Sequence, residues 1–213
     1  MHEFMLQQQT FVLHPYKGIY WKEENALLIA DLHLGKTSHF RKAGIPVPQV
    51  VQQSNFDKFM ALLIDLKPQK VLILGDLFHS NFNNCWEDFI HLTKQFKHIT
   101  FDLIIGNHDI LDVKKYDEAN LNLFGEGRIV GPFILTHHPL KKVPENLFNL
   151  CGHVHPSVRL SGKGRQTLRL PCFYFGKQQG ILPAFGEFTG TFTIKPNKED
   201  RVFVIAEEQV FAV

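Results

Sequence analysis

Five short apolar runs in this chain each end in side chains that can bind metal ions. A continuous apolar run of this length is typical of a buried strand. In open α/β sheets, ligands bind beyond the carboxyl ends of the strands, so we expect these side chains to gather at one edge. The runs and the residues that follow them are ALLIA with Asp31 and His33, VLILG with Asp76, DLIIG with Asn107, His108 and Asp109, PFILT with His137 and His138, and FNLCG with His153 and His155.

Taken singly, each of these patterns has an ordinary explanation. A lone Asp-x-His or His-x-His pair is most often surface chemistry or a hydrogen-bonded core histidine, and Gly106–Asn107 could form a polar turn. Five such patterns in the same place after a strand favour a shared site instead. VLILGD is the central one, because Gly75 permits a sharp backbone turn and the two oxygens of Asp76 could bridge two ions.

The residue types favour a pair of divalent metal ions. Imidazole and carboxylate together suit manganese, iron or zinc, and the lack of cysteine ligands argues against a closed structural zinc site. We expect two ions, and the residue types leave manganese, iron and zinc open. Two metals roughly 3.5–4 Å apart hold a hydroxide between them and clamp the oxygens of an in-line displacement, which suits phosphoryl chemistry. The chain has no G-x-S-x-G, no G-x-x-x-x-G-K-[ST] and no G-x-G-x-x-G after a strand.

Composition sets the broad class of the protein. The chain has 213 residues and a net charge of +2, so no global field indicates a nucleic-acid partner and a local basic patch would be needed. Three widely spaced cysteines, Cys85, Cys151 and Cys172, favour free thiols in a reducing compartment over disulfides. We see no signal-peptide pattern and no apolar run of the ~20 residues that a membrane helix needs. We therefore expect a cytoplasmic protein without a membrane partner.

The first half of the chain alternates predicted strands with predicted helices. Helical periodicity marks residues 50–66 and 85–96, which lie between the apolar runs ending near residues 30, 75 and 105. This order predicts a parallel sheet with right-handed crossovers. A further short helix is expected around 112–119. On the first helix, the apolar stripe that we expect to face the core consists of Phe56, Phe59, Met60, Leu63 and Ile64.

The second half reads as closely spaced strands. VRLSGKGRQTLRL at 158–170 is typical of a hairpin with Gly162 and Gly164 in its turn. No linker or low-complexity segment separates the two halves. We therefore interpret the second half as a second sheet of one domain spanning 1–213, and the alternative is a domain boundary near residue 125.

The ordered motifs D-x-H, G-D, G-N-H-D, H and G-H-x-H resemble those of the calcineurin-like metallophosphoesterases over residues 26–156. The resemblance implies an α/β (α+β) fold, a four-layer αββα sandwich of two mixed sheets flanked by helices. It also implies that His108 is the acid or charge stabiliser at the phosphoryl oxygen and that Asp109 orients it. The implied ligands of one metal are Asp31, His33, Asp76 and His155, and those of the other are Asp76, Asn107, His137 and His153.

Only one of the adjacent His137 and His138 fits as a ligand. His137 is closer to the strand end, and alternation along an extended chain then turns His138 elsewhere. We choose His137, and the sequence leaves both open.

A closer resemblance covers nearly the whole chain. DLHLGK at 31–36, RKAGIPVP at 41–48, LRLPCF at 168–173 and AFGEFTG at 184–190 look like the ligase-associated DNA-damage-response phosphoesterases, the PdeM group. This resemblance implies a manganese-dependent phosphodiesterase or endonuclease that acts on DNA. It also implies association with a DNA ligase and a helicase in repair, and it leaves a homodimer open.

Basic residues flank the predicted site along the sequence. Lys36 and Arg41 follow the first motif, while Arg159 and Arg165 lie in the hairpin after the last. They could contact DNA phosphates, or they could be ordinary solvated charges. Two other functions are compatible with the motifs: a small-molecule nucleotide or cyclic-nucleotide phosphoesterase, and a metal-bearing repair scaffold without activity.

Overall fold

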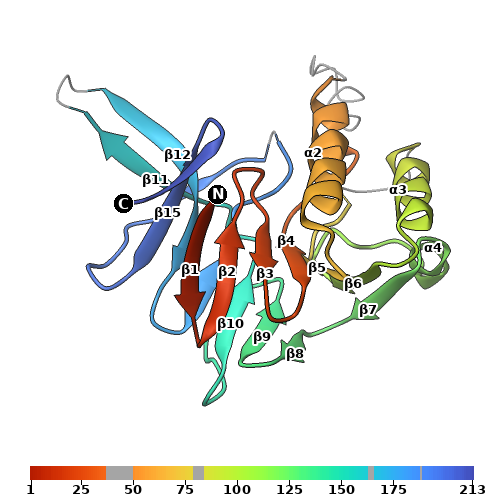
Figure 1. Cartoon of the computed structure of the whole chain (residues 1–213), viewed down its shortest axis with the longest axis horizontal. Helices are drawn as coiled ribbons and strands as arrows, with labels where there is room; N and C mark the ends of the chain where they lie inside the picture. The colour runs from red at the N-terminus through yellow and green to blue at the C-terminus, as the bar shows by residue number, and fades with distance from the viewer. Residues whose placement is uncertain (37–49, 79–83, 163–165, 188) are drawn as a thin grey trace.

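Two β-sheets pack face to face, and the described helices cover the outer face of the first sheet (Figure 1). The structure is a computed structural model, and it describes residues 1–36, 50–78, 84–162, 166–187 and 189–213. The predicted sandwich of two mixed sheets is confirmed.

Among the described residues, the first sheet has seven strands that follow one another in chain order. Strands β1 to β4 pair antiparallel, and β4 to β7 pair parallel. The helices α2 (Val50–Leu66), α3 (Asn84–Gln95) and α4 (Val113–Glu118) connect the parallel strands, as the alternating pattern predicts. The strands are β1 (His2–Leu6), β2 (Gln9–Leu13), β3 (Ile19–Trp21), β4 (Ala26–Ile29), β5 (Lys70–Leu74), β6 (Thr100–Ile104) and β7 (Leu121–Phe124).

The second sheet has nine strands in the described part of the chain, and its central strands β9, β10 and β13 are parallel. The predicted hairpin is formed by β11 and β12, which pair antiparallel. Strand β15 pairs with β12 and with β16. The strands are β8 (Arg128–Val130), β9 (Phe133–Thr136), β10 (Phe148–Cys151), β11 (Pro156–Ser161), β12 (Thr167–Phe175), β13 (Gln179–Ile181), β14 (Phe192–Thr193), β15 (Arg201–Ala206) and β16 (Gln209–Ala212).

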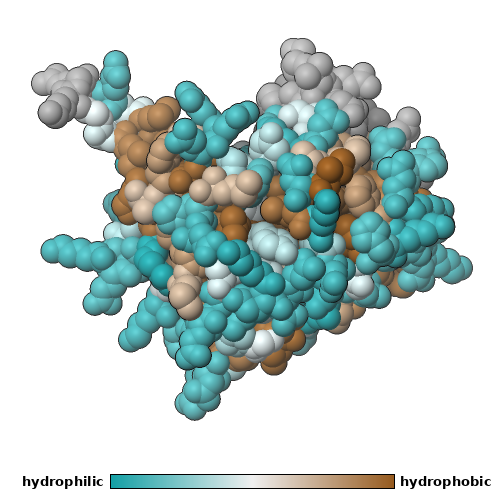
Figure 2. All heavy atoms as spheres, in the orientation of Figure 1, coloured by the Kyte–Doolittle hydropathy of each residue, from teal (hydrophilic) through white to brown (hydrophobic). Residues whose placement is uncertain are grey.

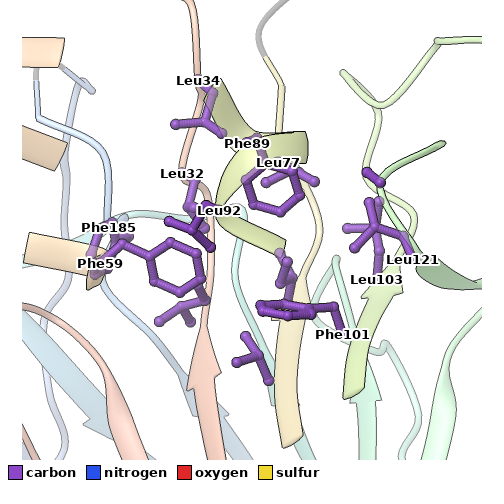
Figure 3. Packing of buried hydrophobic residues seen from close by; sticks show 14 of the residues in the cluster. Leu32, Leu34, Phe59, Leu77, Phe89, Leu92, Phe101, Leu103, Leu121 and Phe185 are labelled. Carbon is purple, nitrogen blue, oxygen red and sulfur yellow. The ribbon is translucent and has the colours of Figure 1, made fainter. Parts of the chain in front are cut away.

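Strands at the centre of the first sheet are buried on both faces. In β4, Leu27 and Ile29 pack against the helices, whereas Leu28 packs against the second sheet. This is why these strands are continuous apolar runs with no polar alternation. The helix-side cluster is shown in Figure 3, where Phe59 and Phe89 lie over the sheet.

Aromatic rings fill the space between the two sheets. The Phe11, Trp21 and Phe133 rings lie with centroids 5.1–5.5 Å apart, and Phe133 meets the other two edge to face. This inter-sheet cluster extends from Phe4 near one end of the chain to Val210 near the other. Residues from both halves thus share one core, which supports the single-domain interpretation; that interpretation stays a prediction.

The flanking helices differ from the four-layer expectation. Among the described residues no helix follows Glu118, and no helix covers the outer face of the second sheet. A small apolar cluster around Val158, Cys172 and Val204 occupies that face instead. None of the described helices has the length and apolarity needed to cross a lipid bilayer.

One face of helix α2 is buried against the first sheet. Leu62 is fully buried against the sheet, whereas Ile64 is 53% exposed, so the prediction that Ile64 faces the core is wrong. Each helical residue turns by about 100°, which moves Ile64 off the face shared by Phe59 and Leu63.

We expect Leu62→Ala to lower the free energy of unfolding by about 2–5 kcal/mol, because it leaves a cavity in the core. Ile64→Ala should change it by less than about 0.5 kcal/mol. Chemical denaturation of both variants checks this, and equal losses would contradict the orientation of α2.

Candidate active site

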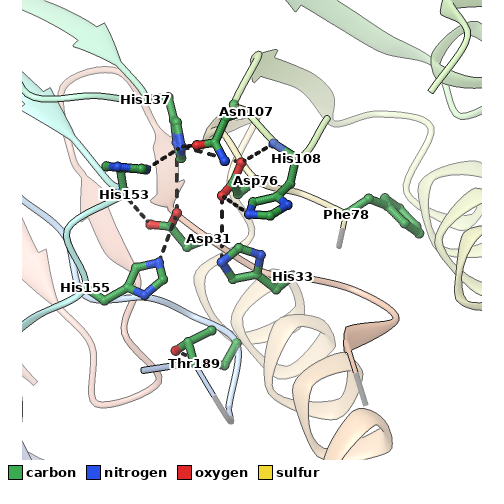
Figure 4. A network of polar contacts seen from close by, with 12 residues as sticks. Asp31, His33, Asp76, Phe78, Asn107, His108, His137, His153, His155 and Thr189 are labelled. Carbon is green, nitrogen blue, oxygen red and sulfur yellow. Dashed lines mark hydrogen bonds and ion pairs between the residues drawn. The ribbon is translucent and has the colours of Figure 1, made fainter. Parts of the chain in front are cut away.

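The carboxyl ends of five strands from both sheets meet at one edge. Strands β4, β5 and β6 supply residues from the first sheet, and β9 and β10 supply residues from the second. Figure 4 shows these side chains facing one another in a single cluster. The sequence-predicted residues brought together there are Asp31, His33, Asp76, Asn107, His108, His137, His153 and His155.

One group of side chains centres on His137. Its Nε2 lies 3.1 Å from Asn107 Oδ1, 3.4 Å from Asp76 Oδ1 and 3.2 Å from His153 Nδ1. The other ring nitrogen, Nδ1, lies 2.9 Å from the Leu74 carbonyl oxygen and can donate a hydrogen bond to it. That tautomer leaves the Nε2 lone pair directed at the other three side chains, as metal-ligating histidines require.

A second group consists of Asp31, His33 and His155, whose ligand atoms lie within 4.8 Å of one another. His155 Nε2 is 3.3 Å from Asp31 Oδ1, and His33 Nε2 is 3.8 Å from Asp76 Oδ2. His155 Nδ1 is 2.9 Å from the Gly190 carbonyl oxygen, which fixes its ring in the same way. Asp76 therefore faces the first group with Oδ1 and the second group with Oδ2.

The charges and hydrogen bonds of the cluster fit divalent cations. Asp31 and Asp76 are almost completely buried, and Asp31 Oδ1 accepts no hydrogen bond from the described residues. Buried carboxylates without compensation are costly, and a cation bound between them would remove that cost. Burial, His138 and His137 lower the pKa of His153, which favours the neutral ring that a metal ligand must have.

The backbone of the cluster is strained. Five candidate ligands have φ between +48° and +65°, a region that residues other than glycine rarely adopt: Asp31, His33, Asp76, His153 and His155. Sheet-like hydrogen bonds from Asp31 N to Gly75 O and from His33 N to Asp76 O hold the first loop in place. Strain of this kind persists only where the surrounding structure enforces it, and it is typical of functional sites.

Glycines allow the loops that follow the strands to lie in close contact with the candidate ligands. A Cβ on Gly75 would lie 2.3 Å from His137 Nδ1, one on Gly106 2.3 Å from Asp76 Oδ1, and one on Gly152 2.5 Å from Asp31 Oδ2. Each of these glycines immediately precedes a candidate ligand in the sequence. A glycine before the polar residue is therefore the local sequence signal of the site.

Asp109 holds two of these loops together. Its Oδ1 accepts a hydrogen bond from Phe78 N at 3.2 Å, and its Oδ2 accepts one from Gly106 N at 2.9 Å. Burial raises the pKa of Asp109 to about 6. Since both oxygens accept backbone N–H groups, Asp109 positions the loop that carries His108. Direct orientation of the His108 ring by Asp109 stays a prediction.

His108 lies at the open side of the cluster. Its backbone N–H donates to Asp76 Oδ1 at 2.9 Å, and its Nε2 is 4.0 Å from Asp76 Oδ2. The side chain is 39% exposed, so the ring is accessible to a substrate while its backbone is fixed to Asp76.

The structure distinguishes the two adjacent histidines. The His137 ring is buried among Asp76 and Asn107, whereas His138 is exposed and its ring lies 4.0 Å from that of His153. His138 could still join His137 and His153 around an ion, because the three offer ligand atoms within 4.8 Å. The geometry favours His137 as the ligand and His138 as its neighbour.

One supporting segment was missed by reasoning from the residues alone. In the stretch after β13, Phe185 N donates to Ala30 O and Gly186 N donates to Asp31 O. A Cβ on Gly186 would lie 2.4 Å from Leu32 O. The segment therefore braces the loop of Asp31 and His33 from behind. AFGEFTG was the only signal, and nothing local in it indicates this contact.

The predicted basic residues are only partly within the described chain. Lys36 lies close enough to Asp76 and Asp31 to interact with them electrostatically. Burial lowers the pKa of Lys36, and the two carboxylates oppose that shift. Arg159 is exposed on β11. Arg41 and Arg165 lie outside the described residues.

Comparison with known proteins identifies the family. The model of the calcineurin-like phosphoesterases matches residues 25–171, which span most of the chain and all of the clustered side chains. The chain belongs to the calcineurin-like phosphoesterase family. It is accordingly a metal-dependent phosphoesterase that uses divalent ions, which confirms the predicted family and enzyme class.

A solved structure extends the likeness over the full length. The crystal structure of Pseudomonas putida nuclease MPE matches with a TM-score of 0.83 and 29% identity, covering 100% of this chain and 99% of that one. The comparison with curated proteins found no match.

We expect Gly152→Ala in this phosphoesterase to lose bound metal, because its Cβ would displace Asp31 Oδ2 and press on Ala30. Metal content after manganese loading and gel filtration measures this. Gly125→Ala is the matched control, since nothing lies within 4 Å of its Cβ. Full metal content in Gly152→Ala would contradict the proposed crowding at Asp31.

Proposed function

We propose that this phosphoesterase hydrolyses phosphodiester bonds of DNA with two divalent ions, manganese being the first choice. The observation that carries the proposal is the position of Asp76 between two groups of ligand atoms. A paired site of this kind suits the in-line displacement at phosphorus. The full-length likeness to a nuclease supports a nucleic-acid substrate.

The two groups correspond to two proposed metal sites. Asp76 would be shared, so that its two oxygens hold the ions in a fixed relation. When bound, the ions supply positive charge at the phosphoryl oxygens and activate water. The proposed ligands are Asp31, His33, Asp76 and His155 for one ion, and Asp76, Asn107, His137 and His153 for the other.

The protein's own groups fix the geometry of the reaction. Leu74 and Gly190 carbonyl oxygens hold the His137 and His155 rings in one tautomer. His108 is exposed beside Asp76 and is placed to donate a proton to the leaving oxygen or to stabilise its charge. Asp109 fixes the loop of His108 through Gly106.

Substrate and context extend the proposal. Lys36 beside the carboxylates and Arg159 on β11 are proposed contacts to DNA phosphates. Arg41 and Arg165 are proposed as further contacts on sequence grounds. The resemblance to the PdeM group supports a cytoplasmic role in repair beside a DNA ligase and a helicase, and a homodimer is the proposed assembly to test.

We expect Asp76→Asn to abolish manganese-dependent hydrolysis, because one neutral amide oxygen cannot bridge two cations. The assay compares a bis-aryl phosphodiester, a cyclic nucleotide, and single-stranded, nicked and duplex DNA. Asp117→Asn, an exposed carboxylate on α4, is the control and should keep full activity. Diesterase activity retained in Asp76→Asn would refute the shared-ligand role. Turnover of the cyclic nucleotide far faster than any DNA would favour the small-molecule alternative.

We expect His108→Gln to slow DNA cleavage by about 10²–10⁴-fold, the usual contribution of a general acid. The bis-aryl substrate should be affected much less, because its leaving oxygen is a better leaving group and needs little protonation. Steady-state kinetics on both substrates, with metal content as a control, checks this. Equal losses on both would rule out the acid role and leave charge stabilisation.

A further inference from the structure

The β11–β12 hairpin extends past the edge that carries the metal-binding side chains. Strand β11 runs in the same direction as β10, because β11 is antiparallel to β12, β12 is antiparallel to β13, and β13 is parallel to β10. Strand β10 ends at this edge, His153 and His155 follow, and β11 begins at Pro156. The hairpin therefore continues away from the sandwich, and Figure 1 shows it projecting from the molecule.

The two faces of this hairpin differ in chemistry. Arg159 lies directly opposite Arg169, and Leu160 lies directly opposite Leu168. Because successive residues on a strand point to opposite faces, the arginine pair and the leucine pair lie on different sides. Leu160 and Leu168 are 37% and 58% exposed, and hydrophobic surface lies over the hairpin in Figure 2.

The position of β12 residues in the core shows which face is which. Arg169 shares its face with Phe173 and Phe175, which pack between the two sheets. Leu170 and Cys172, on the other face, belong to the outer cluster. The arginines thus extend the inner face of the second sheet beyond the metal-binding edge, on the side of the first sheet.

The arginine pair is electrostatically unfavourable by itself. Like charges placed directly opposite each other on a sheet destabilise it. Within the part of the chain that the structure describes, neither Arg159 nor Arg169 forms an ion pair with a carboxylate. An anion bound between them would relieve the repulsion. A guanidinium group suits a phosphate because it can donate two parallel N–H···O hydrogen bonds to the phosphate oxygens.

We propose that Arg159 and Arg169 together bind a second phosphate, further along a nucleic-acid strand that leaves the metal centre along the inner face of the hairpin. This inference rests on the proposed function and deepens it. Arg159 is four residues beyond His155, roughly 13 Å of extended strand. The pair can therefore meet only a substrate that carries a second phosphate, so it distinguishes a polynucleotide from a small diester.

The test uses the double variant Arg159→Gln with Arg169→Gln in the full chain. Its kcat/KM should fall by about tenfold or more on a long single-stranded oligonucleotide, the loss expected for charge-assisted hydrogen bonds. It should be unchanged on the bis-aryl phosphodiester and on a dinucleotide with one phosphate. The plot of log kcat/KM against log salt should become shallower by about 0.7, the value for one phosphate contact on a single strand.

Matched variants distinguish phosphate binding by the arginine pair from a general effect of losing two positive charges. Lys141→Gln with Lys177→Gln removes the same charge from exposed positions; Lys177 lies just past the end of β12 remote from the hairpin turn. This control should leave both the ratio of activities and the salt slope unchanged. Arg159→Lys with Arg169→Lys should keep the slope and lose part of the affinity, because lysine keeps the charge without the paired geometry.

Binding gives a readout that does not need catalysis. In the Asp76→Asn background, fluorescence anisotropy with a labelled oligonucleotide should show the same weakening when both arginines are replaced. Unchanged binding and unchanged kinetics would overturn the arginine pair, as would equal losses on the bis-aryl substrate. Failure of the wild-type protein to cleave any phosphodiester would instead refute the proposed function, and with it this inference.

Discussion

The carboxylate of Asp76 is the interaction on which the rest of the site depends. One oxygen faces His137 from the second sheet, and the other faces His33 from the first. The side chain is almost completely buried, so its charge must be balanced by cations or by neighbouring imidazoles. The two groups of ligand atoms exist as one site only when the two sheets are packed, because neither sheet carries a complete set.

Packing of the sandwich also sustains unfavourable local geometry. Asp31 and His155 hold left-handed backbone conformations, and Gly75 and Gly152 leave room for side chains that any Cβ would displace. The segment Phe185–Gly186 adds backbone hydrogen bonds to Ala30 and Asp31 from the far half of the chain. The large inter-sheet core, in which aromatic rings pack among aliphatic side chains, offsets the cost of this strain.

Different parts of the fold contribute chemistry and selectivity. The strand ends carry the cluster of carboxylates and imidazoles, and metal ions held by such a cluster could act on any phosphodiester that reaches them. Discrimination between substrates therefore depends on the residues that surround the cluster. The β11–β12 hairpin has arginines on its inner face and leucines on its outer face, and it connects directly to His155. Its inner face is suited to a polyanion, which is the basis of the proposed preference for nucleic acid.

The sequence by itself determined the strand ends, the types of candidate ligand and helices such as α2, because apolar runs, helical spacing and a glycine before Asp76, Asn107 and His153 are local signals. Only the tertiary structure shows that His137 is buried beside Asp76 and Asn107 whereas His138 is exposed, because the two side chains differ in what packs against them. The tertiary structure also shows that Ile64 is exposed, contrary to the prediction. It places Arg159 opposite Arg169, and it places Gly186 where its N–H donates to Asp31 O. Strand register and packing depend on segments distant in the chain, whereas periodicity reports on one segment at a time.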